Sequence, residues 1–426
     1  MGCTYLDGYT TIPTLTEDGL GAFIRAAPGS LWIVGNEPDR GPNPEDLSCT
    51  ARVQDDTLPE VYAQAYHDIY TFIKQRDPTA QVANAGLVQV TPGRLQYLDK
   101  VWEAYQQRYG QAMPVDVWNM HLYILPEARP DGRPNGIANI ALGTDPALAK
   151  RESGDDPRRC PDPQVYCYAE HDSLEVFAEQ VVAMRAWMKA HGQQNKPLIL
   201  SEYSILYPYR YPYEHSETCF KDEFGQCFTP ERVQTFMSRT FEYLENAADP
   251  ALGYPMDGYR LVQRWLWFSA YYRGAGRDSS LLTPTLNALS AVGERYRDEV
   301  ARHASTVNLR PGSVGSSPGY VKSPGDRATV QLYVQIFNNG SVATPGPFAV
   351  TFYADQDLTQ VIGTAIVSDT VPGCASRART AYVTWADLPV GVHRFWVKVD
   401  SWDSLVETDE TDNVGQGTVI VTAHPS

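Results

Sequence analysis

The feature that most constrains the fold is a regular alternation of short apolar runs with amphipathic helical stretches through the first three hundred residues. The runs occupy residues 31–34, 82–88, 115–123, 198–203 and 261–269. Most of them are apolar throughout rather than alternating, as expected for strands that are buried on both faces of a parallel sheet. Strand–helix alternation over this length predicts an α/β fold of the TIM type, a (β/α)₈ barrel.

Helices are expected between these runs. One helix begins at Thr229-Pro230, where an N-cap residue is followed by proline at the first helical position, and another begins in the same way at Thr283-Pro284. A third is indicated by apolar side chains that recur at helical spacing, namely Leu174, Phe177, Val181, Met184 and Met188.

The pattern changes after about residue 303. Residues 311–326 are rich in Pro, Gly and Ser and are expected to form turns or a linker. Short alternating runs follow at residues 330–336, 348–353, 361–367, 380–385, 393–399 and 418–422. They predict an immunoglobulin-like antiparallel β-sandwich. The expected domains are therefore residues 1–303 and residues 304–426.

Composition limits the partners. The net charge of −16 would repel a polyanion, so nucleic acid is not expected as a partner. No apolar run of about 18 residues is present, so no membrane span is expected, and no signal peptide is visible at the N-terminus. No cofactor is predicted, and no metal, since neither a CxxC nor an HxxxH pair occurs.

The cysteines indicate the compartment. The chain has seven cysteines, and two pairs of them are close in sequence, Cys160 with Cys167 and Cys219 with Cys227. Local disulfides at these places would fit an exported protein, and free thiols are the alternative. We therefore expect an extracellular or cell-surface protein.

Two glutamates follow apolar runs directly. Glu37 ends the stretch Leu-Trp-Ile-Val-Gly-Asn-Glu, and Glu202 ends the stretch Pro-Leu-Ile-Leu-Ser-Glu. In a TIM barrel, functional groups project from the carboxyl ends of the strands. Two carboxyl groups that face each other across one bond are the requirement for glycoside hydrolysis.

Four stretches resemble the retaining (β/α)₈-barrel glycoside hydrolases of clan A. Asn-Glu-Pro at 36–38 resembles the acid/base strand of that clan, its fourth, and residues 196–203 are similar to the nucleophile strand, its seventh. Residues 116–123, which contain His-x-Tyr, resemble strand six, and residues 264–268 resemble strand eight. The four stretches occur in the order that the clan requires.

The resemblance implies a role for each residue. Glu202 would be the nucleophile and Glu37 the acid/base residue of a retaining glycosidase that acts on a poly- or oligosaccharide. Asn36 would hold the sugar 2-hydroxyl, and Tyr123 or His121 would orient the nucleophile. Tyr203 is placed beside the substrate, and Trp267 or Trp265 would form the sugar platform, with Trp267 preferred because it is nearer the strand end.

Structural alternatives exist for several of these residues. Glu37 would serve as a capping or ion-paired residue near Arg40, and Glu202 as a structural acid. His121 would be a hydrogen-bonded core histidine. The tyrosine-rich segment at 203–214 would either line the cleft or pack on itself.

The C-terminal residues resemble the CARDB family of bacterial adhesion-type β-sandwiches. The resemblance rests on Phe-Asn-Asn-Gly at 337–340 and on the acidic stretch at 406–413. It implies a spacer or attachment domain of a secreted bacterial enzyme that contacts a cell surface or a polysaccharide. A non-catalytic carbohydrate-binding or adhesion protein is the alternative function.

The segment before Glu37 is shorter than in enzymes of the clan. Only 36 residues precede this glutamate, whereas three β/α units of about 30 residues each should come before a fourth barrel strand. We therefore expect a barrel that lacks its first strands, with two open sheet edges. The activity of this chain by itself is uncertain for the same reason.

Overall fold

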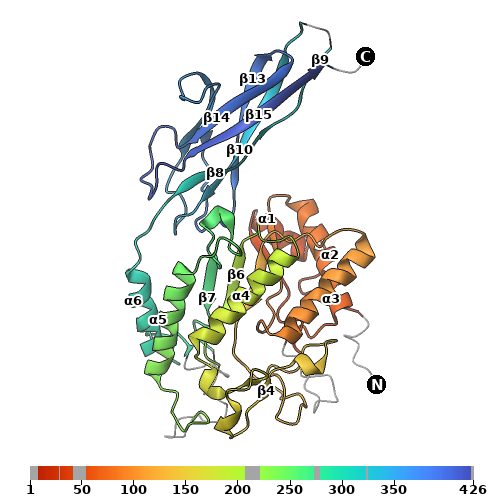
Figure 1. The fold of residues 1–426 in the computed structure, drawn as a ribbon, viewed down its shortest axis with the longest axis vertical. Helices are drawn as coiled ribbons and strands as arrows, with labels where there is room; N and C mark the ends of the chain where they lie inside the picture. Colours follow the sequence, from red (N-terminus) through yellow and green to blue (C-terminus); the bar gives the residue numbers. More distant parts are fainter. Residues whose placement is uncertain are drawn as a thin grey trace. The chain divides into compact units, whose positions relative to one another are not determined.

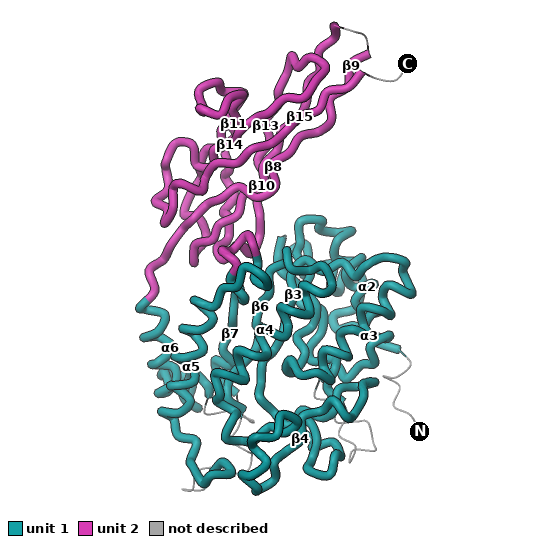
Figure 2. The backbone as a smooth tube through the Cα atoms, viewed as in Figure 1, with its two compact units in different colours: residues 1–254, 260–302 teal, residues 255–259, 303–426 magenta. Residues whose placement is uncertain are grey.

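The computed structural model describes residues 8–27, 29–41, 54–206, 221–272, 279–322 and 325–423. The chain divides into two compact units, one of residues 1–254 and 260–302 and one of residues 255–259 and 303–426 (Figure 2). The main division lies one residue from the boundary expected at 303/304. The short segment 255–259, which includes the 3₁₀ turn Pro255–Asp257, belongs to the second unit.

Five parallel strands form the centre of the first unit (Figure 1). β1 (Leu31–Val34) pairs with β2 (Gln81–Asn84), and β6 (Leu198–Tyr203) pairs with β3 (Trp118–His121) on one side and β7 (Arg264–Trp267) on the other. A parallel bridge between Ala83 and Val117 joins the two groups. The five expected strands are therefore present in the expected order, although β2, β3 and β7 are shorter than their apolar runs.

Asn84 explains why β2 and β3 share a single bridge instead of a continuous ladder. Its buried amide donates to the backbone oxygen of Asn119 at 2.9 Å and accepts from the backbone nitrogen of the same residue at 2.8 Å. A side chain thus supplies the two hydrogen bonds that a neighbouring strand would otherwise make.

Helices alternate with the strands along the chain. They are α1 (Leu20–Ala26), α2 (Pro59–Arg76), α3 (Pro92–Tyr109), α4 (Leu174–Ala190), α5 (Pro230–Asn246) and α6 (Ala291–Ala301). Alternate side chains of the strands pack against them in one large core. Trp118 of β3, for example, contacts Trp102 of α3 and Trp187 of α4 with ring centroids 6.2 and 5.0 Å apart.

The opposite side chains of the strands form a smaller cluster of Leu31, Ala83, Val117 and Ile199. On the two outer strands this face is open to solvent, since Ile33 of β1 is 41% exposed and Leu266 of β7 is 59% exposed. Within the described residues, five parallel strands are found rather than eight, and β1 and β7 each pair on one side only. A closed barrel is therefore not observed.

The expected helix start at Thr283-Pro284 is wrong. Residues 283–286 form a turn, in which the backbone nitrogen of Leu286 donates to Thr283 and Leu286 itself has a φ of 58°. A bridge between Leu282 and Leu289 closes the loop around this turn. The helix α6 begins later, where Ser290 caps it by accepting from the nitrogen of Gly293 at 3.0 Å. The helix start predicted at Thr229-Pro230 is observed, since the hydroxyl of Thr229 accepts from the backbone nitrogen of Arg232.

The second unit is a β-sandwich. One sheet has the order β13 (Arg379–Leu388), β10 (Ala328–Asn338) and β8 (Leu309–Ser316). The other has the order β12 (Val361–Val367), β11 (Phe348–Tyr353), β14 (Gly391–Val399), β15 (Val414–Ala423) and β9 (Gly319–Val321). Alternate residues of β10 are buried, as their spacing predicts, in a core shared by both sheets. The pair β15–β9 is parallel, so the sandwich is not wholly antiparallel.

The linker expected at residues 311–326 is also wrong, because β8 and β9 occupy most of it. β8 contains Pro311 and Gly312, which argued against a strand. It lies at the edge of its sheet and pairs with β10 alone. A proline that lacks an amide donor is tolerated at such an edge, where one side of the strand has no ladder to complete.

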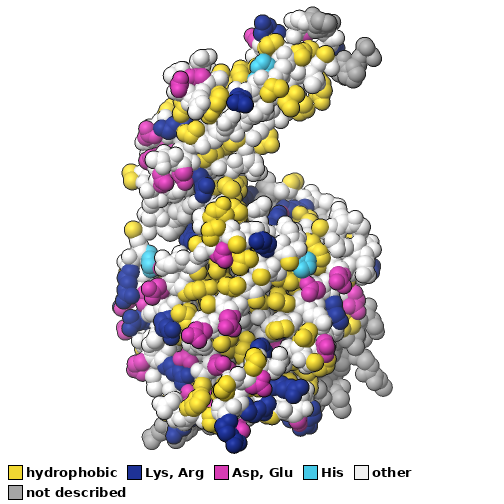
Figure 3. All heavy atoms as spheres, viewed as in Figure 1, with side chains coloured by type: hydrophobic (Ala, Val, Ile, Leu, Met, Phe, Trp, Pro, Cys, Tyr) yellow, Lys and Arg dark blue, Asp and Glu magenta, His cyan; other side chains and the backbone are white. Residues whose placement is uncertain are grey.

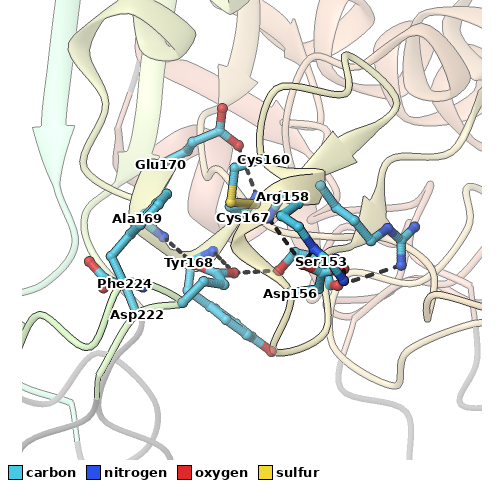
Figure 4. Close-up of a disulfide and its surroundings, with 12 residues drawn as sticks. Ser153, Asp156, Arg158, Cys160, Cys167, Tyr168, Ala169, Glu170, Asp222 and Phe224 are labelled. Atoms are coloured by element: carbon cyan, nitrogen blue, oxygen red, sulfur yellow. Dashed lines mark hydrogen bonds and ion pairs between the residues drawn. A yellow bond between two sulfur atoms is a disulfide. The ribbon is translucent and has the colours of Figure 1, made fainter.

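A disulfide closes the loop before α4. Cys160 and Cys167 are joined, with Cα atoms 5.5 Å apart, and the backbone nitrogen of Cys167 donates to Glu170 at 2.8 Å (Figure 4). Cys227 is also disulfide-bonded, while Cys219 lies outside the described residues. The expectation of a local disulfide at 160–167 is therefore confirmed.

The surface shows charges of both signs. On the face drawn in Figure 3, lysine and arginine side chains are scattered among aspartate and glutamate side chains. Among the described helices, none combines the length and apolar character that crossing a membrane requires.

Candidate active site

Glu37 follows β1 in a constrained backbone. Its φ is 45°, in the left-handed region that non-glycine residues seldom adopt. The backbone nitrogen of Glu37 donates to the oxygen of Gly86 at 3.0 Å, and its own oxygen accepts from Arg40 at 3.2 Å. The residue is only 5% exposed. These bonds turn the carboxyl group away from the strand and toward β3 and β6.

Glu202 lies near the carboxyl end of β6. Register shifts occur on both sides of it, between Met120 and His121 on β3 and between Leu200 and Tyr203 opposite β7. The hydroxyl of Tyr123 donates to Glu202 Oε1 at 2.6 Å. The side chain of Glu202 is 22% exposed, so the carboxylate is held by a buried phenol and still open to solvent.

His121 lies between the two glutamates. Its Nδ1 is 3.0 Å from Glu37 Oε1 and 4.0 Å from Glu202 Oε2. One ligating atom from each of the three side chains lies within 4.8 Å of the others. The two carboxyl groups that the sequence placed at strand ends are thus brought together, and of the two side chains expected to orient Glu202, Tyr123 contacts it directly while His121 contacts Glu37.

Gly86 determines where the imidazole of His121 can lie. A Cβ at position 86 would be 2.2 Å from His121 Cδ2. Only a residue without a side chain can therefore occupy this position while the ring stays beside Glu37. This close approach had no signal in the sequence.

Charges and burial set the protonation of the site. Burial raises the pKa of Glu202, and the charge of His121 and the Tyr123 hydrogen bond partly offset this. Burial lowers the pKa of His121, but its hydrogen bond to Glu37 and the charges of Glu37, Glu202 and Asp39 outweigh burial and raise it overall. Burial, followed by the charge of Glu202, raises the pKa of Tyr123 well above its usual value, so this phenol remains a donor.

Glu37, His121 and Glu202 also have the chemistry to hold a metal ion, since they offer two carboxylates and one imidazole nitrogen. A second set, Cys160, Cys167 and Glu223, is close together as well. Its two sulfurs are joined in the disulfide and provide no thiolate.

The sugar platform predicted at Trp265 and Trp267 is wrong. Trp267 is buried, its Nε1 donates to the oxygen of Ser279 at 2.7 Å, and its ring packs against Tyr203 and Phe236. Trp265 packs against Phe241 of α5. Two residues apart on a strand, both rings point the same way, and that way is toward the helices.

Tyr203 is not a substrate-facing residue either. It is fully buried, and its hydroxyl lies 3.3 Å from Thr240 Oγ1 on α5. Because Tyr203 follows Glu202 on the strand, it takes the opposite face and joins the core. Its inclusion among the substrate-binding residues is therefore corrected.

Asn36, which directly precedes Glu37, is exposed. Its side chain donates to Gln54 Oε1, and its backbone nitrogen donates to Asp55 Oδ2 at 2.6 Å. A contact with a sugar hydroxyl therefore stays a prediction. The tyrosines expected at the cleft between residues 207 and 213 lie outside the described residues.

Phe268 and Asp55 were missed by sequence reasoning. Phe268 follows Trp267, is half-buried, and packs against Tyr272 with ring centroids 5.3 Å apart. Strand alternation would have indicated it, had Trp267 been assigned to the core. Asp55 is near enough to Glu37 for the charge of that glutamate to raise its pKa, after the larger effect of burial.

Comparison with known proteins identifies the second unit. The CARDB family matches residues 314–416. A solved CARDB domain from Pyrococcus furiosus, determined with two metal ions, is 20% identical, with a TM-score of 0.22, and the match covers 29% of this chain and 99% of that domain. The predicted CARDB sandwich is therefore confirmed.

Solved structures that match a larger share of the chain include glycoside hydrolases of low similarity. A glucosidase from Croceicoccus marinus is 12% identical with a TM-score of 0.37, and the match covers 83% of this chain and 65% of the glucosidase. A family 44 xyloglucanase from Paenibacillus polymyxa is 13% identical with a TM-score of 0.28, covering 84% and 66%. The chain thus spans about two thirds of these enzymes. No curated protein sequence matches the chain.

Proposed function

We propose that the chain is a retaining glycoside hydrolase in which Glu202 is the nucleophile and Glu37 the acid/base residue. The observation that carries this proposal is the pairing of two carboxyl groups at neighbouring strand ends, with one oxygen of each within 4.8 Å of the other. Retaining enzymes keep their carboxyl groups about 5–5.5 Å apart, whereas inverting enzymes need about 6.5–9.5 Å for a water molecule.

The reaction follows from the surroundings of each carboxyl group. Glu202, bonded by Tyr123 and open to solvent, attacks the anomeric carbon and forms a covalent glycosyl-enzyme. Glu37 donates a proton to the departing oxygen and later takes a proton from the water that hydrolyses the intermediate. His121, hydrogen-bonded to Glu37, fixes the position of that carboxyl group, and its charge stabilises the carboxylate between the two proton transfers.

The aromatic platform for the sugar is assigned to Phe268 in place of the two tryptophans. Phe268 directly follows β7, and its backbone nitrogen donates to the oxygen of Tyr203 on β6 at 2.9 Å. Its half-buried ring, packed on Tyr272, offers the flat apolar surface on which a sugar ring stacks. The substrate is a carbohydrate, because a pair of carboxyl groups at this separation is the arrangement that cleaves glycosidic bonds.

An extracellular or cell-surface setting is part of the proposal. The Cys160–Cys167 disulfide supports an oxidising compartment, and the CARDB match supports an attachment role for residues 314–416. A non-catalytic carbohydrate-binding or adhesion protein is the second candidate. The CARDB domain and the open outer strands β1 and β7 favour it.

Hydrolysis by variants tests the proposal. Aryl β-glycosides and β-glucans are offered to the wild type, Glu37→Gln and Glu202→Gln, and sugar release is measured. We expect kcat to fall at least about 1000-fold in Glu202→Gln on every substrate, because no covalent intermediate can form. In Glu37→Gln the loss should be about 100-fold or more on substrates whose leaving group needs a proton.

Folding and binding separate the two candidates. Circular dichroism verifies that the variants are folded, and calorimetry measures sugar binding. Sugar binding without turnover in the wild type would reject the enzyme and favour the adhesion protein.

A further inference from the structure

We propose that Arg94 is a positioning residue for proton transfer, which holds the Glu37 carboxyl in place by binding Asp39. Arg94 lies in the first turn of α3, and its Nη1 forms an ion pair with Asp39 Oδ2. Asp39 is two residues after Glu37 on the same loop. The inference rests on the proposed function, because it assigns Arg94 a part in the step that Glu37 performs.

The ion pair is completely enclosed. The side chains of Arg94 and Asp39 are both 0% exposed, and Glu127, which accepts from Arg94 Nε at 2.8 Å, is 1% exposed. A buried arginine with two buried carboxylates is costly to desolvate and adds little net stability compared with apolar residues. Such an arrangement is better explained by what it holds in position than by its contribution to folding.

Asp39 depends on Arg94 far more than Glu127 does. Glu127 also accepts from Gln89 at 3.0 Å, from Thr91 at 2.6 Å and from the backbone nitrogen of Lys150 at 2.8 Å. Among the described residues, the other hydrogen bonds that a different residue donates to the Asp39 carboxylate are long, at 3.3 and 3.4 Å from the nitrogen of Val88. Weakening Arg94 therefore affects the Asp39 side of the cluster first.

Arg94 also joins two loops around the glutamate. Its Nη2 donates to the backbone oxygens of Ala138 and Asn139 at 2.8 and 2.9 Å. Asn139 in turn donates to the oxygen of Gly41 at 2.7 Å, and the nitrogen of Leu142 donates to the oxygen of Asp39 at 3.0 Å. The loop at 37–41 is thus fastened on both sides of Asp39.

Glu37 needs such a support because its backbone is strained. A φ of 45° in a residue with a side chain persists only where neighbouring contacts hold it. The described contacts of the Glu37 carboxyl with other side chains amount to one hydrogen bond, to His121. Its direction toward the leaving group therefore depends on the loop, and a proton donor must be within hydrogen-bond reach of its acceptor.

The dependence of the rate on the leaving group tests this inference. The rates of Arg94→Lys and the wild type are compared on two glycosides of the sugar that the wild type hydrolyses best. One is an alkyl or phenyl glycoside, whose leaving group needs a proton donor, and the other is the dinitrophenyl glycoside, whose leaving group does not. We expect kcat/KM to fall about 100-fold for the first and less than about 3-fold for the second. A role in folding alone would lower both rates equally.

Arg185→Lys is the matched control. Arg185 is equally buried, but it bonds Leu261, Lys196 and Gln263 at the amino-terminal ends of the strands, away from the glutamates. We expect it to change both substrates by the same factor. Asp39→Asn is the second variant in case Arg94→Lys does not fold, and it should show the same selective loss.

Three outcomes are distinguishable. A selective loss in Arg94→Lys or Asp39→Asn, absent in Arg185→Lys, supports the inference. An equal loss on both substrates overturns it while the proposed function stands. If the wild type hydrolyses no glycoside, the proposed function fails, and this inference fails with it.

Discussion

His121 and Tyr123 divide the task of preparing the two glutamates. The imidazole contacts Glu37 at 3.0 Å, whereas the phenol contacts Glu202 at 2.6 Å. Both side chains come from the end of β3 or just after it, and they reach the same pair of glutamates because they are two residues apart. The His-x-Tyr spacing predicted that both would face the site, but it could not tell which glutamate each would contact.

Removing the phenol should shift the pH dependence. Burial raises the pKa of Glu202, and the Tyr123 hydrogen bond lowers it by stabilising the carboxylate. In Tyr123→Phe that pKa should therefore rise further, because the carboxylate loses a hydrogen bond that stabilises its charged form. Because the nucleophile must be ionised, activity is lost as the pH falls through this pKa. The acidic limb of kcat/KM should then move to higher pH.

Tyr203→Phe is the control for this experiment. Its hydroxyl contacts Thr240 on α5 instead of Glu202, so the acidic limb should stay where it is in the wild type. An unchanged acidic limb in Tyr123→Phe would show that the hydrogen bond does not stabilise the ionised nucleophile.

Arg94 and Gly86 show what residue patterns leave out. An arginine in the first turn of a helix and a glycine after a strand are common, and neither indicates a site. Arg94 acts through a pair with Asp39, 55 residues away in sequence, and Gly86 through the space it leaves for His121, 35 residues further on. Such long-range contacts are determined by how the elements pack.

The contact between strands β2 and β3 depends on one side chain, that of Asn84. Asn84 supplies both hydrogen bonds to the backbone of Asn119, and all these groups are buried. In Asn84→Ala the backbone of Asn119 should lose both partners, and the free energy of unfolding should fall by about 2–4 kcal/mol. Urea unfolding followed by circular dichroism measures this change.

Asn246→Ala provides the comparison. Asn246 is exposed at the end of α5, so its loss should change the free energy of unfolding by less than about 0.5 kcal/mol. Equal stability of Asn84→Ala and the wild type would mean that the Asn84 bonds do not hold the two strands together.

The type of each element was largely predictable from the sequence, whereas the face of the strand on which each side chain lies was not. Apolar runs located all five parallel strands of the first unit, and alternation located β10 to β12 of the sandwich closely. The face taken by Trp265, Trp267 and Tyr203 was assigned wrongly, because apolar side chains such as Leu266 and Ile199 also occupy the opposite face of these strands. The apolar pattern therefore does not reveal which face packs against the helices. β8 was missed because its proline is compatible with an edge strand only, and edge position depends on the whole sheet.

At the scale of the molecule, a strand–helix unit and a CARDB sandwich are joined in one chain. The barrel expected from strand–helix alternation is represented by five strands in the described part of the chain, with apolar side chains open at Ile33 and Leu266. The two glutamates nevertheless meet, because β1 and β6 carry them to the same end of the strand array. Sequence order placed them correctly even though the closure of the barrel is not observed.

The covalent intermediate is the central claim, and trapping it is the most direct test. The chain is incubated with 2-deoxy-2-fluoro glycosyl fluorides of the sugars it hydrolyses, digested, and mapped by mass spectrometry. We predict one added fluoroglycosyl group, on the peptide that contains Glu202, and no label in Glu202→Gln. Continued hydrolysis of glycosides without any label, or a label on a different residue, would contradict the assignment of Glu202 as the nucleophile.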